Sequence, residues 1–400
     1  MCAPTRFVLG SVLLALAISI SLSAALAGPA GGPAPPRTVM VTDLGREDKA
    51  IGPGAPAHVI GLTGVNHGID MNTGAMAYGL LYVAALDPKD PRGAVPGEGY
   101  IGMPKPNAFN WYWGGFFDLV LNGRSIGGTF PHSVTGRSSG ARGYVDFVFD
   151  TPQAMVRIRF VAKAGGDCLY CQAKIEPKEA IRSAHLGLRC YPAGFITTGD
   201  RHMLSATRDL PQGTQGKLDA AKESWLLCYD KVFDWGVDVN GLRGGGPCAA
   251  IWLPEEVVDG SYLPGGYGAG IGLNLKPGVN DYRFVFFDFS GKTNAAAQAA
   301  IKARAPELAK ELAAFDFADP VLRAWPVEQK WVEVQKALAS AGDAEAKAKY
   351  ERWHNGLPAM LKALGGGQGA IMAESEAARA VAEWEKGLPE LLLKELLAGI

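Results

Sequence analysis

Three stretches of the chain carry polar side chains on one face and apolar side chains on the other. In residues 155–163, 169–176 and 184–191 the two kinds alternate, which is the pattern of a strand with one buried face. If the three strands form a meander, their polar faces share one sheet surface. That surface then carries Arg157, Arg159, Gln172, Lys174, Glu176, His185, Arg189 and Tyr191.

Such a surface has the chemistry to hold a polyhydroxylated or anionic sugar. Arginine offers a planar, permanently charged fork of donors, and histidine titrates near neutral pH. We therefore predict that Glu176 and His185 are catalytic residues that transfer protons. The alternative is that these strands present only the solvated face of an antiparallel sheet, which is normally polar. The ligand-binding residues predicted on this surface are Arg157, Arg159, Lys174, Arg189 and Tyr191.

Two tryptophans in the segment Asn110–Phe117 add aromatic surface. In a strand, Trp111 and Trp113 share a face, and their rings beside Asn110 offer a stacking platform for a sugar. The competing interpretation is core packing, because large aromatic side chains supply much of a sandwich's buried area. We predict both tryptophans as ligand-binding residues.

The cysteines allow several interpretations. Of six in the sequence, Cys2 lies in the apolar N-terminal segment, and Cys168 and Cys171 have C-x-x-C spacing. A redox pair of cysteines requires a helix N-terminus, but the residues flanking this pair favour a strand. A zinc ribbon requires a second C-x-x-C pair, and none follows. A local bridge or two buried thiols fits better. Disulfides are the default in an exported chain, and the pairing stays open among Cys168, Cys171, Cys190, Cys228 and Cys248.

No metal or cofactor site is predicted. The histidines include no H-x-x-x-H pair and no H-E-x-x-H motif. Residues 266–272, with the sequence GYGAGIG, look like a glycine-rich phosphate loop, but a short strand and a turn follow them instead of a helix. We interpret this segment as a flexible connection within the β region.

Short strands separated by Gly, Pro, Asn and Asp fill the chain from about residue 38 to residue 290. With no amphipathic helices between them, they predict a large antiparallel two-sheet β-sandwich. Asn122-Gly123 between two apolar runs is a strong signal for a two-residue hairpin. The candidate strands are residues 38–43, 57–62, 77–86, 109–121, 144–149, 155–163, 169–176, 184–191, 225–229, 248–253 and 282–289.

The composition changes near Asn294, where Ala, Glu, Lys and Leu take over. Apolar residues then recur every three or four positions, as at Ile301, Ala305 and Leu308, which indicates helices. Residues 294–400 are therefore predicted as a helical region of three or four helices that follows the sandwich of residues 38–290. This region serves either as a brace against the sandwich or as an arm that binds a protein partner.

Composition excludes two classes of protein. Hydrophobic residues make up 48% of the 400 and charged residues 20%, which is enough apolar surface for a core and rules out a disordered chain. Lys and Arg number 39 against 40 Asp and Glu, so the net charge is −1. A chain without a basic excess lacks the general means of neutralising phosphates, so nucleic acid is not predicted as a partner.

The N-terminus predicts export. Arg6 precedes an apolar run from Phe7 to Ala27, which ends in a small-x-small site of the kind that a signal peptidase cleaves. We predict residues 1–27 as a signal peptide and 28–37 as a Pro/Gly-rich spacer. The mature protein is then secreted or periplasmic and has no membrane segment. The alternative is an uncleaved anchor, since about 20 apolar residues span a bilayer.

Two functions are consistent with these features. The first is an exported carbohydrate-binding or carbohydrate-active β-sandwich protein. The second is a non-catalytic envelope scaffold or interaction protein whose helices dock a partner. They differ in whether Glu176, His185 and Arg189 converge in a pocket or lie on a convex, solvated surface. The sequence leaves open whether the protein is an enzyme.

Overall fold

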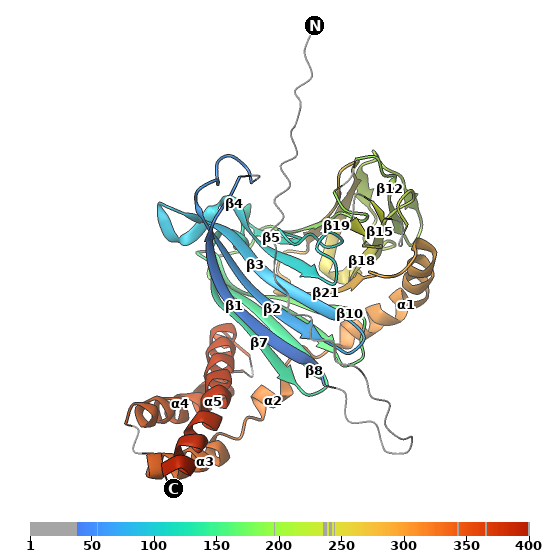
Figure 1. Cartoon of the computed structure of the whole chain (residues 1–400). Helices are drawn as coiled ribbons and strands as arrows, with labels where there is room; N and C mark the ends of the chain where they lie inside the picture. The colour runs from blue at the N-terminus through green and yellow to red at the C-terminus, as the bar shows by residue number, and fades with distance from the viewer. Residues whose placement is uncertain are drawn as a thin grey trace.

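Two antiparallel sheets packed face to face, followed by helices, make up the described part of the chain (Figure 1). The computed structural model describes residues 38–53, 55–195, 197–234, 238–239, 242–243, 245–341, 344–364 and 366–398. The prediction of a two-sheet antiparallel sandwich followed by a helical region is confirmed. The predicted signal peptide and spacer, residues 1–37, lie outside the described residues.

The first sheet has ten strands among the residues described. It contains the predicted hairpin, in which Asn122 and Gly123 have φ angles of 46° and 79°, the left-handed geometry of a type I′ turn. Across the sheet the strands are β1 (Met40–Ala50), β2 (Thr63–Asn72), β3 (Ala77–Asp87), β4 (Asp90–Lys105), β5 (Phe117–Leu121), β11 (Ala184–Cys190), β20 (Ala269–Leu275), β19 (Val257–Pro264) and β14 (Gly216–Leu218), with β6 (Arg124–Ser125) paired to β5.

The second sheet has nine strands in the same described ranges. Residues 57–62, predicted as a strand, form a turn and belong to neither sheet. A separate two-stranded ribbon joins β16 (Asp238–Val239) and β17 (Leu242–Arg243). Across the nine-stranded sheet the strands are β13 (Asp209–Leu210), β12 (Arg201–Ser205), β15 (Trp225–Asp230), β18 (Cys248–Trp252), β21 (Asp281–Asp288), β10 (Cys168–Pro177), β9 (Ala154–Lys163), β8 (Arg142–Asp150) and β7 (Pro131–Ser139).

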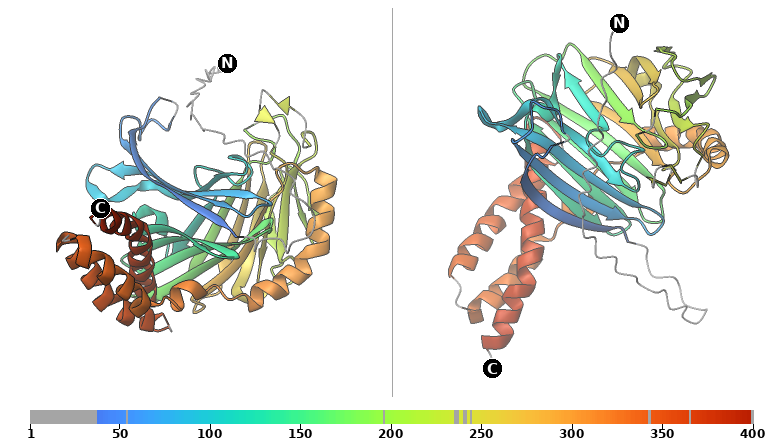
Figure 2. Two further views of the ribbon diagram at one scale, coloured as in Figure 1. Left: turned by 60° about the horizontal axis from the view of Figure 1, so that its bottom comes forward. Right: turned by 45° about the horizontal axis from the view of Figure 1, so that its top comes forward.

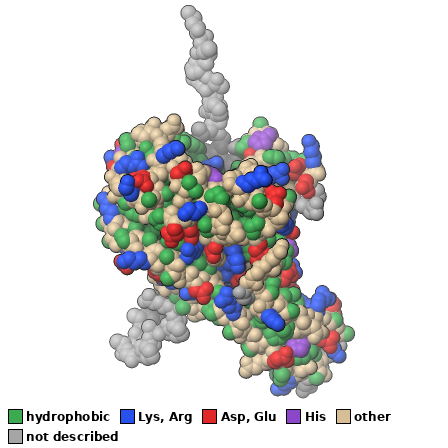
Figure 3. Space-filling model, turned by 180° about the vertical axis from the view of Figure 1, so that it is seen from behind, with side chains coloured by type: hydrophobic (Ala, Val, Ile, Leu, Met, Phe, Trp, Pro, Cys, Tyr) green, Lys and Arg blue, Asp and Glu red, His purple; other side chains and the backbone are tan. Residues whose placement is uncertain are grey.

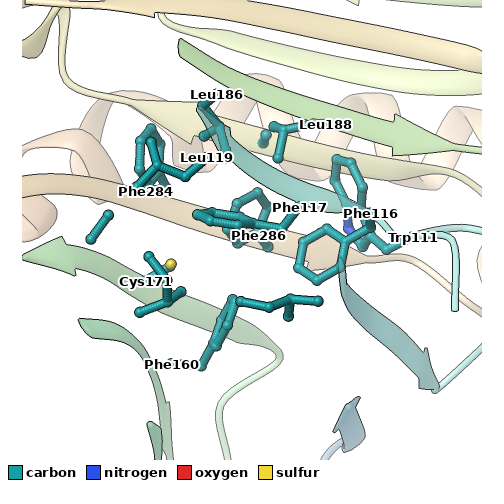
Figure 4. Close-up of a cluster of buried hydrophobic side chains, with 14 of the residues drawn as sticks. Trp111, Phe116, Phe117, Leu119, Phe160, Cys171, Leu186, Leu188, Phe284 and Phe286 are labelled. Atoms are coloured by element: carbon teal, nitrogen blue, oxygen red, sulfur yellow. The ribbon is translucent and has the colours of Figure 1, made fainter. Parts of the chain in front are cut away.

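The inner faces of the two sheets enclose one aromatic-rich core (Figure 4). Phe116 and Phe117 of the first sheet pack edge-on against Phe286 of the second, with ring centroids 5.4 and 6.3 Å apart. The predicted alternation in residues 155–163, 169–176 and 184–191 is confirmed, because every second residue faces this core, as at Val156, Ile158 and Phe160. Met155, Val161 and Tyr170 lie on the other face and pack in separate clusters with the helices. Two 3-10 turns border it, η1 (Ile126–Gly128) and η2 (Pro254–Glu256).

The helices gather on the outer side of the nine-stranded sheet, which leaves the outer face of the ten-stranded sheet free of them (Figure 2). The first helix packs on β15, β18 and β21, and the start of the last helix packs on β7, β8 and β9. None of the described helices is both long and apolar enough to cross a bilayer. The helices are α1 (Asn294–Ala314), α2 (Pro320–Arg323), α3 (Val327–Ala341), α4 (Ala344–Ala363) and α5 (Ala370–Ala398).

The last three helices form a lobe of their own (Figure 3). Its core is separate from that of the sandwich and centres on the buried indole of Trp384, which packs against Tyr350 with ring centroids 5.2 Å apart. The far end of α5 exposes four leucines, Leu392, Leu393, Leu396 and Leu397. The predicted role of these helices in binding a protein partner stays a prediction.

Candidate functional site

The predicted polar faces do not share one surface. Strands β9 and β10 are neighbours, with Arg159 directly opposite Gln172, but β11 lies in the other sheet between β5 and β20. The meander prediction is therefore wrong, because the chain crosses between the sheets after Pro177, in residues 178–183. Glu176 and His185 consequently lie on opposite outer faces of the sandwich, where they cannot exchange protons with one ligand.

Arg157 and Arg159 lie buried beneath α5 and hold that helix on the sheet. Arg159 makes a two-pronged ion pair with Asp146, at 2.7 and 2.6 Å, and donates a further bond of 2.8 Å to Glu374 of α5. Arg157 also pairs with Glu374 and donates to Gln172 over 2.6 Å. Burial alone would raise the pKa of Glu374, but the charges of Arg159 and Arg157 hold it at about 2.

Glu176 and Lys174 belong to the same contact between sheet and helix. The Glu176 carboxylate accepts the backbone N–H groups of Gly369 and Ile371, at 2.9 and 2.8 Å, and so caps the first turn of α5. Lys174 is half-buried, and its charge acts on Glu374. Four of the predicted site residues therefore attach the helical lobe to the sandwich.

The two tryptophans point in different directions, which corrects the prediction that they share a face. Residues 108–115 form turns, and β5 begins only at Phe117. The Asn107 side chain accepts the backbone N–H of Phe109 over 2.9 Å, which starts the turn. Trp111 is fully buried, and its indole N–H donates to the carbonyl of Phe287 over 2.8 Å (Figure 4). The Trp113 side chain is 41% exposed.

The outer face of the ten-stranded sheet brings together the other three predicted residues, His185, Arg189 and Tyr191. Their positions alternate along β11 and the residue after it, so their side chains lie on the same side of the sheet. Gly187 takes the position between His185 and Arg189 on that side. On the neighbouring strand β20, Gly272 lies opposite Gly187. The centre of this face is consequently bare backbone, with polar and aromatic side chains at its two ends.

Packing does not require glycine at Gly187 or Gly270, whereas a Cβ atom on Gly272 would come within 2.6 Å of the Ser261 hydroxyl oxygen. A Cβ atom on Gly187 would come no closer than 3.8 Å to the carbonyl of Asp118, and one on Gly270 no closer than 3.9 Å to that of Leu188. Both contacts are ordinary van der Waals distances, so larger side chains would fit here and would simply fill the space above the sheet. Glycine at these positions therefore keeps that space open.

Two adjoining cavities lie above this backbone. The first has a volume of about 410 Å³ and is lined by Gly187, Arg189 and Tyr267, among others. The second has about 600 Å³ and shares Leu263 and Gly270 with the first, before reaching Ser261 and Gln215. Each lies within the range of roughly 300–1,000 Å³ that is usual for ligand pockets. We call the two together the groove.

Aromatic rings line the end of the groove that contains Arg189. Tyr267 is 52% exposed, and its ring stands edge-on to that of Tyr191, with centroids 5.4 Å apart. Behind them Phe195 stacks on Tyr267 at 5.7 Å, and Tyr112 packs against Tyr191 at 5.0 Å. The rings are held by one another, so they present a rigid surface at little cost in side-chain entropy.

The charged groups of the groove are Arg189 and Asp118. The Asp118 carboxylate accepts the hydroxyl of Ser125 over 2.5 Å, and burial raises its pKa although that bond and the nearby charges of His185 and Arg189 lower it. Arg189 is exposed and lines the first cavity together with Tyr191. Among the described residues it makes no ion pair within 4 Å.

Hydrogen-bonding groups continue along the face from His185. Its Nδ1 lies 2.9 Å from Oδ1 of Asn274, and the Asn274 amide donates to Asp259 over 2.6 Å. These side chains come from three neighbouring strands, β11, β20 and β19, and are held in register by the sheet. The arrangement offers a row of donors and acceptors to a ligand that lies across the strands.

Sequence reasoning missed the glycines and Tyr267. Residues 266–272 were expected to be a flexible connection, whereas Ala269–Leu275 forms the regular strand β20. The available signal was the spacing of Gly268, Gly270 and Gly272, since residues two apart share one face of a strand.

The five described cysteines are buried free thiols, so the expectation of disulfides is not met. Cys168 and Cys171 point to opposite faces of β10, because three residues along a strand reverse the direction of the side chain. Cys190, Cys228 and Cys248 lie in the core, where the thiol of Cys190 donates to the carbonyl of Ala269 and that of Cys248 to the carbonyl of Asn110. Within the described ranges no group of three His, Cys, Asp or Glu side chains is placed to hold a metal ion.

No protein-family model matches the chain, and no curated protein matches it. Similar solved structures include a chondroitinase AC lyase (11% identity, TM-score 0.35), an α-N-acetylgalactosaminidase of Bifidobacterium bifidum (11%, 0.38) and a xanthan lyase of Paenibacillus (10%, 0.31). The matches cover 60%, 67% and 59% of this chain and only 39%, 41% and 25% of those chains. These neighbours are carbohydrate-active enzymes, and at such scores the likeness assigns no activity to this chain.

Proposed function

We propose that the protein binds a carbohydrate in the groove on the outer face of the ten-stranded sheet. The observation that carries this proposal is the bare backbone of Gly187 and Gly270 beside the exposed ring of Tyr267. A strand glycine that packing does not require is a place where a ligand can approach the backbone closely.

The two parts of the groove suit the two surfaces of a sugar. A pyranose ring has a flat face of C–H groups, which packs on an aromatic ring such as Tyr267. Its hydroxyl groups need fixed donors and acceptors, which Ser261 and Gln215 supply in the second cavity. His185 and Asn274 continue this polar surface on the same sheet face outside the two cavities. The open form of both cavities fits a ligand that lies along the surface.

A glycan array probed with the mature protein tests this proposal. We expect binding to a defined set of glycans and, for Tyr267→Ala, an affinity at least roughly tenfold lower, which corresponds to about 1.4 kcal/mol. The matched control is Leu393→Ala, which removes an equally exposed apolar side chain from α5. Absence of glycan binding, or equal binding by Tyr267→Ala and the control, would overturn the proposal.

A further inference from the structure

One charged side chain of the groove is placed to select its ligand. Arg189 stands at the aromatic end beside Tyr191, is exposed and, within the described part of the chain, lies outside ion-pairing distance of any carboxylate. The second charged group, Asp118, is half-buried, and its carboxylate accepts the Ser125 hydroxyl. Both groups line the first cavity, but only the side chain of Arg189 is exposed.

We propose that the groove takes an acidic oligosaccharide and that Arg189 binds the carboxylate of one of its uronic acid units. This inference rests on the proposed carbohydrate function. The planar fork of a guanidinium matches the two oxygens of a carboxylate, and such charge-assisted bonds are about twice as strong as neutral ones. The sheet register places Arg189 opposite Gly270, at the edge of the first cavity.

The second cavity has room for a further sugar unit, so the proposed ligand is an oligosaccharide. It continues from the first through Leu263 and Gly270, and its lining from Gln215 to Gly272 contains no charged residue. A neighbouring sugar unit in this cavity therefore contacts backbone, hydroxyl and amide groups only. The site thus recognises one negative charge of the ligand at the Arg189 end and the hydroxyl groups of the neighbouring sugar unit beyond it.

The test compares acidic oligosaccharides with neutral counterparts of the same shape. The probes are tetrasaccharides of hyaluronan, chondroitin, alginate and polygalacturonate, each measured by calorimetry beside its carboxyl-reduced form. We expect at least one acidic member to bind roughly tenfold or more tightly than its reduced form. Its affinity should fall as NaCl is raised from about 50 to 500 mM, because salt screens an exposed charge.

Three variants assign the effect to Arg189. Arg189→Met should lose the preference for the acidic form and its salt dependence, and Arg189→Lys should keep the salt dependence but only part of the affinity. Arg182→Met removes an exposed arginine just before β11 and should bind as the unaltered protein does. Thermal unfolding should be unchanged in all three, since the positions are exposed.

The outcomes separate the two proposals. Equal binding of acidic and reduced tetrasaccharides, or an unchanged preference in Arg189→Met, overturns the acidic ligand and leaves carbohydrate binding standing. If neither the tetrasaccharides nor the neutral glycans of the array bind, both proposals are overturned.

Discussion

Gly187 of β11 lies directly opposite Gly272 of β20, so two adjacent strands cross the groove without a side chain between them. The next pair along, Arg189 and Gly270, places the exposed guanidinium over a third glycine. Side chains on three strands of an antiparallel sheet normally cover such a surface. Here the backbone itself forms the bottom of the cavity.

Substitution of Gly187 by Val should abolish ligand binding while the fold persists. A Cβ atom at this position would come no closer than 3.8 Å to the protein, and β-branched residues suit strands, so the melting temperature should hold. The affinity for a glycan that the unaltered protein binds should fall by at least about tenfold. Gly52→Val is the control, since a Cβ there has nothing within 4 Å and lies away from the groove. Unchanged affinity would show that the ligand does not contact the backbone of β11.

Substitution of Arg159 by Met should destabilise the protein and leave glycan affinity unaltered. The carboxylates of Asp146 and Glu374 then stay buried without Arg159 as their partner. Breaking a buried ion pair in this way lowers the free energy of unfolding by about 3–5 kcal/mol. Chemical denaturation measures the loss. Arg46→Met, which breaks the exposed pair with Asp48, should change the free energy of unfolding by less than about 1 kcal/mol. Should Arg159→Met fail to fold, Glu374→Gln offers a milder form of the same test.

A large loss of glycan affinity in folded Arg159→Met, with little loss of stability, would contradict the structural role. It would return Arg159 to the ligand-binding set that the sequence predicted.

The buried carboxyl of Asp288 should make the protein less stable as the pH rises. Burial raises its pKa to about 6 against the hydrogen bonds from Ser290 and Asn110, whereas the unfolded value is 3.8. A raised folded pKa adds stability that is complete below pH ~4 and is lost as the pH passes ~6, a change of about 3 kcal/mol. Asp288→Asn should therefore flatten the difference in unfolding free energy between pH 4 and pH 7. A pH profile identical to that of the unaltered protein would refute this.

The thiols should be unreactive until the protein unfolds. All five described cysteines are buried, and burial raises the pKa of Cys171 and Cys248 well above that of an exposed thiol. A colourimetric thiol reagent at pH 8 should titrate none in the native mature protein and five after addition of denaturant. A count of three or fewer under denaturing, non-reducing conditions would mean that a disulfide has formed.

The proposed export of the protein predicts a mature chain that begins near Gly28. The Ala-Leu-Ala site before it suits a signal peptidase, and residues 1–27 then leave with Cys2. N-terminal sequencing of protein from the cell envelope and from the medium measures the start. Retention of Phe7 in the mature chain would favour an uncleaved anchor.

Local pattern was enough to predict the fold class, because alternation and turn chemistry act over a few residues. Val156, Ile158 and Phe160 face the core as their spacing requires, and Asn122-Gly123 closes the predicted hairpin. Which sheet a strand joins is decided by contacts far along the chain. Strand β11 has the same alternation as β10, so nothing local reports that it pairs with β5 and β20.

The site was predictable only in part for the same reason. His185, Arg189 and Tyr191 were found from the polar face of β11, and they do border the groove or its sheet face. Arg157, Arg159 and Glu176 looked equally polar, but a helix some 200 residues later covers them. Trp111 was misplaced because Asn107 bends the chain before β5. Gly187 was missed because a glycine has no side chain whose chemistry could mark it as part of a binding site.

The cap that Glu176 places on α5 has a consequence for how the chain matures. Its partners Gly369 and Ile371 follow it by 193 and 195 residues. At a synthesis rate of roughly 5–20 residues per second, these two residues are added to the chain about 10–40 s after β10. During that interval the outer face of β9 and β10 is an open, positively charged sheet surface, to which a chaperone or a second nascent chain has access. Completion of the last helix closes it, so a chain interrupted before Gly369 would differ from the finished protein at a site far from the break.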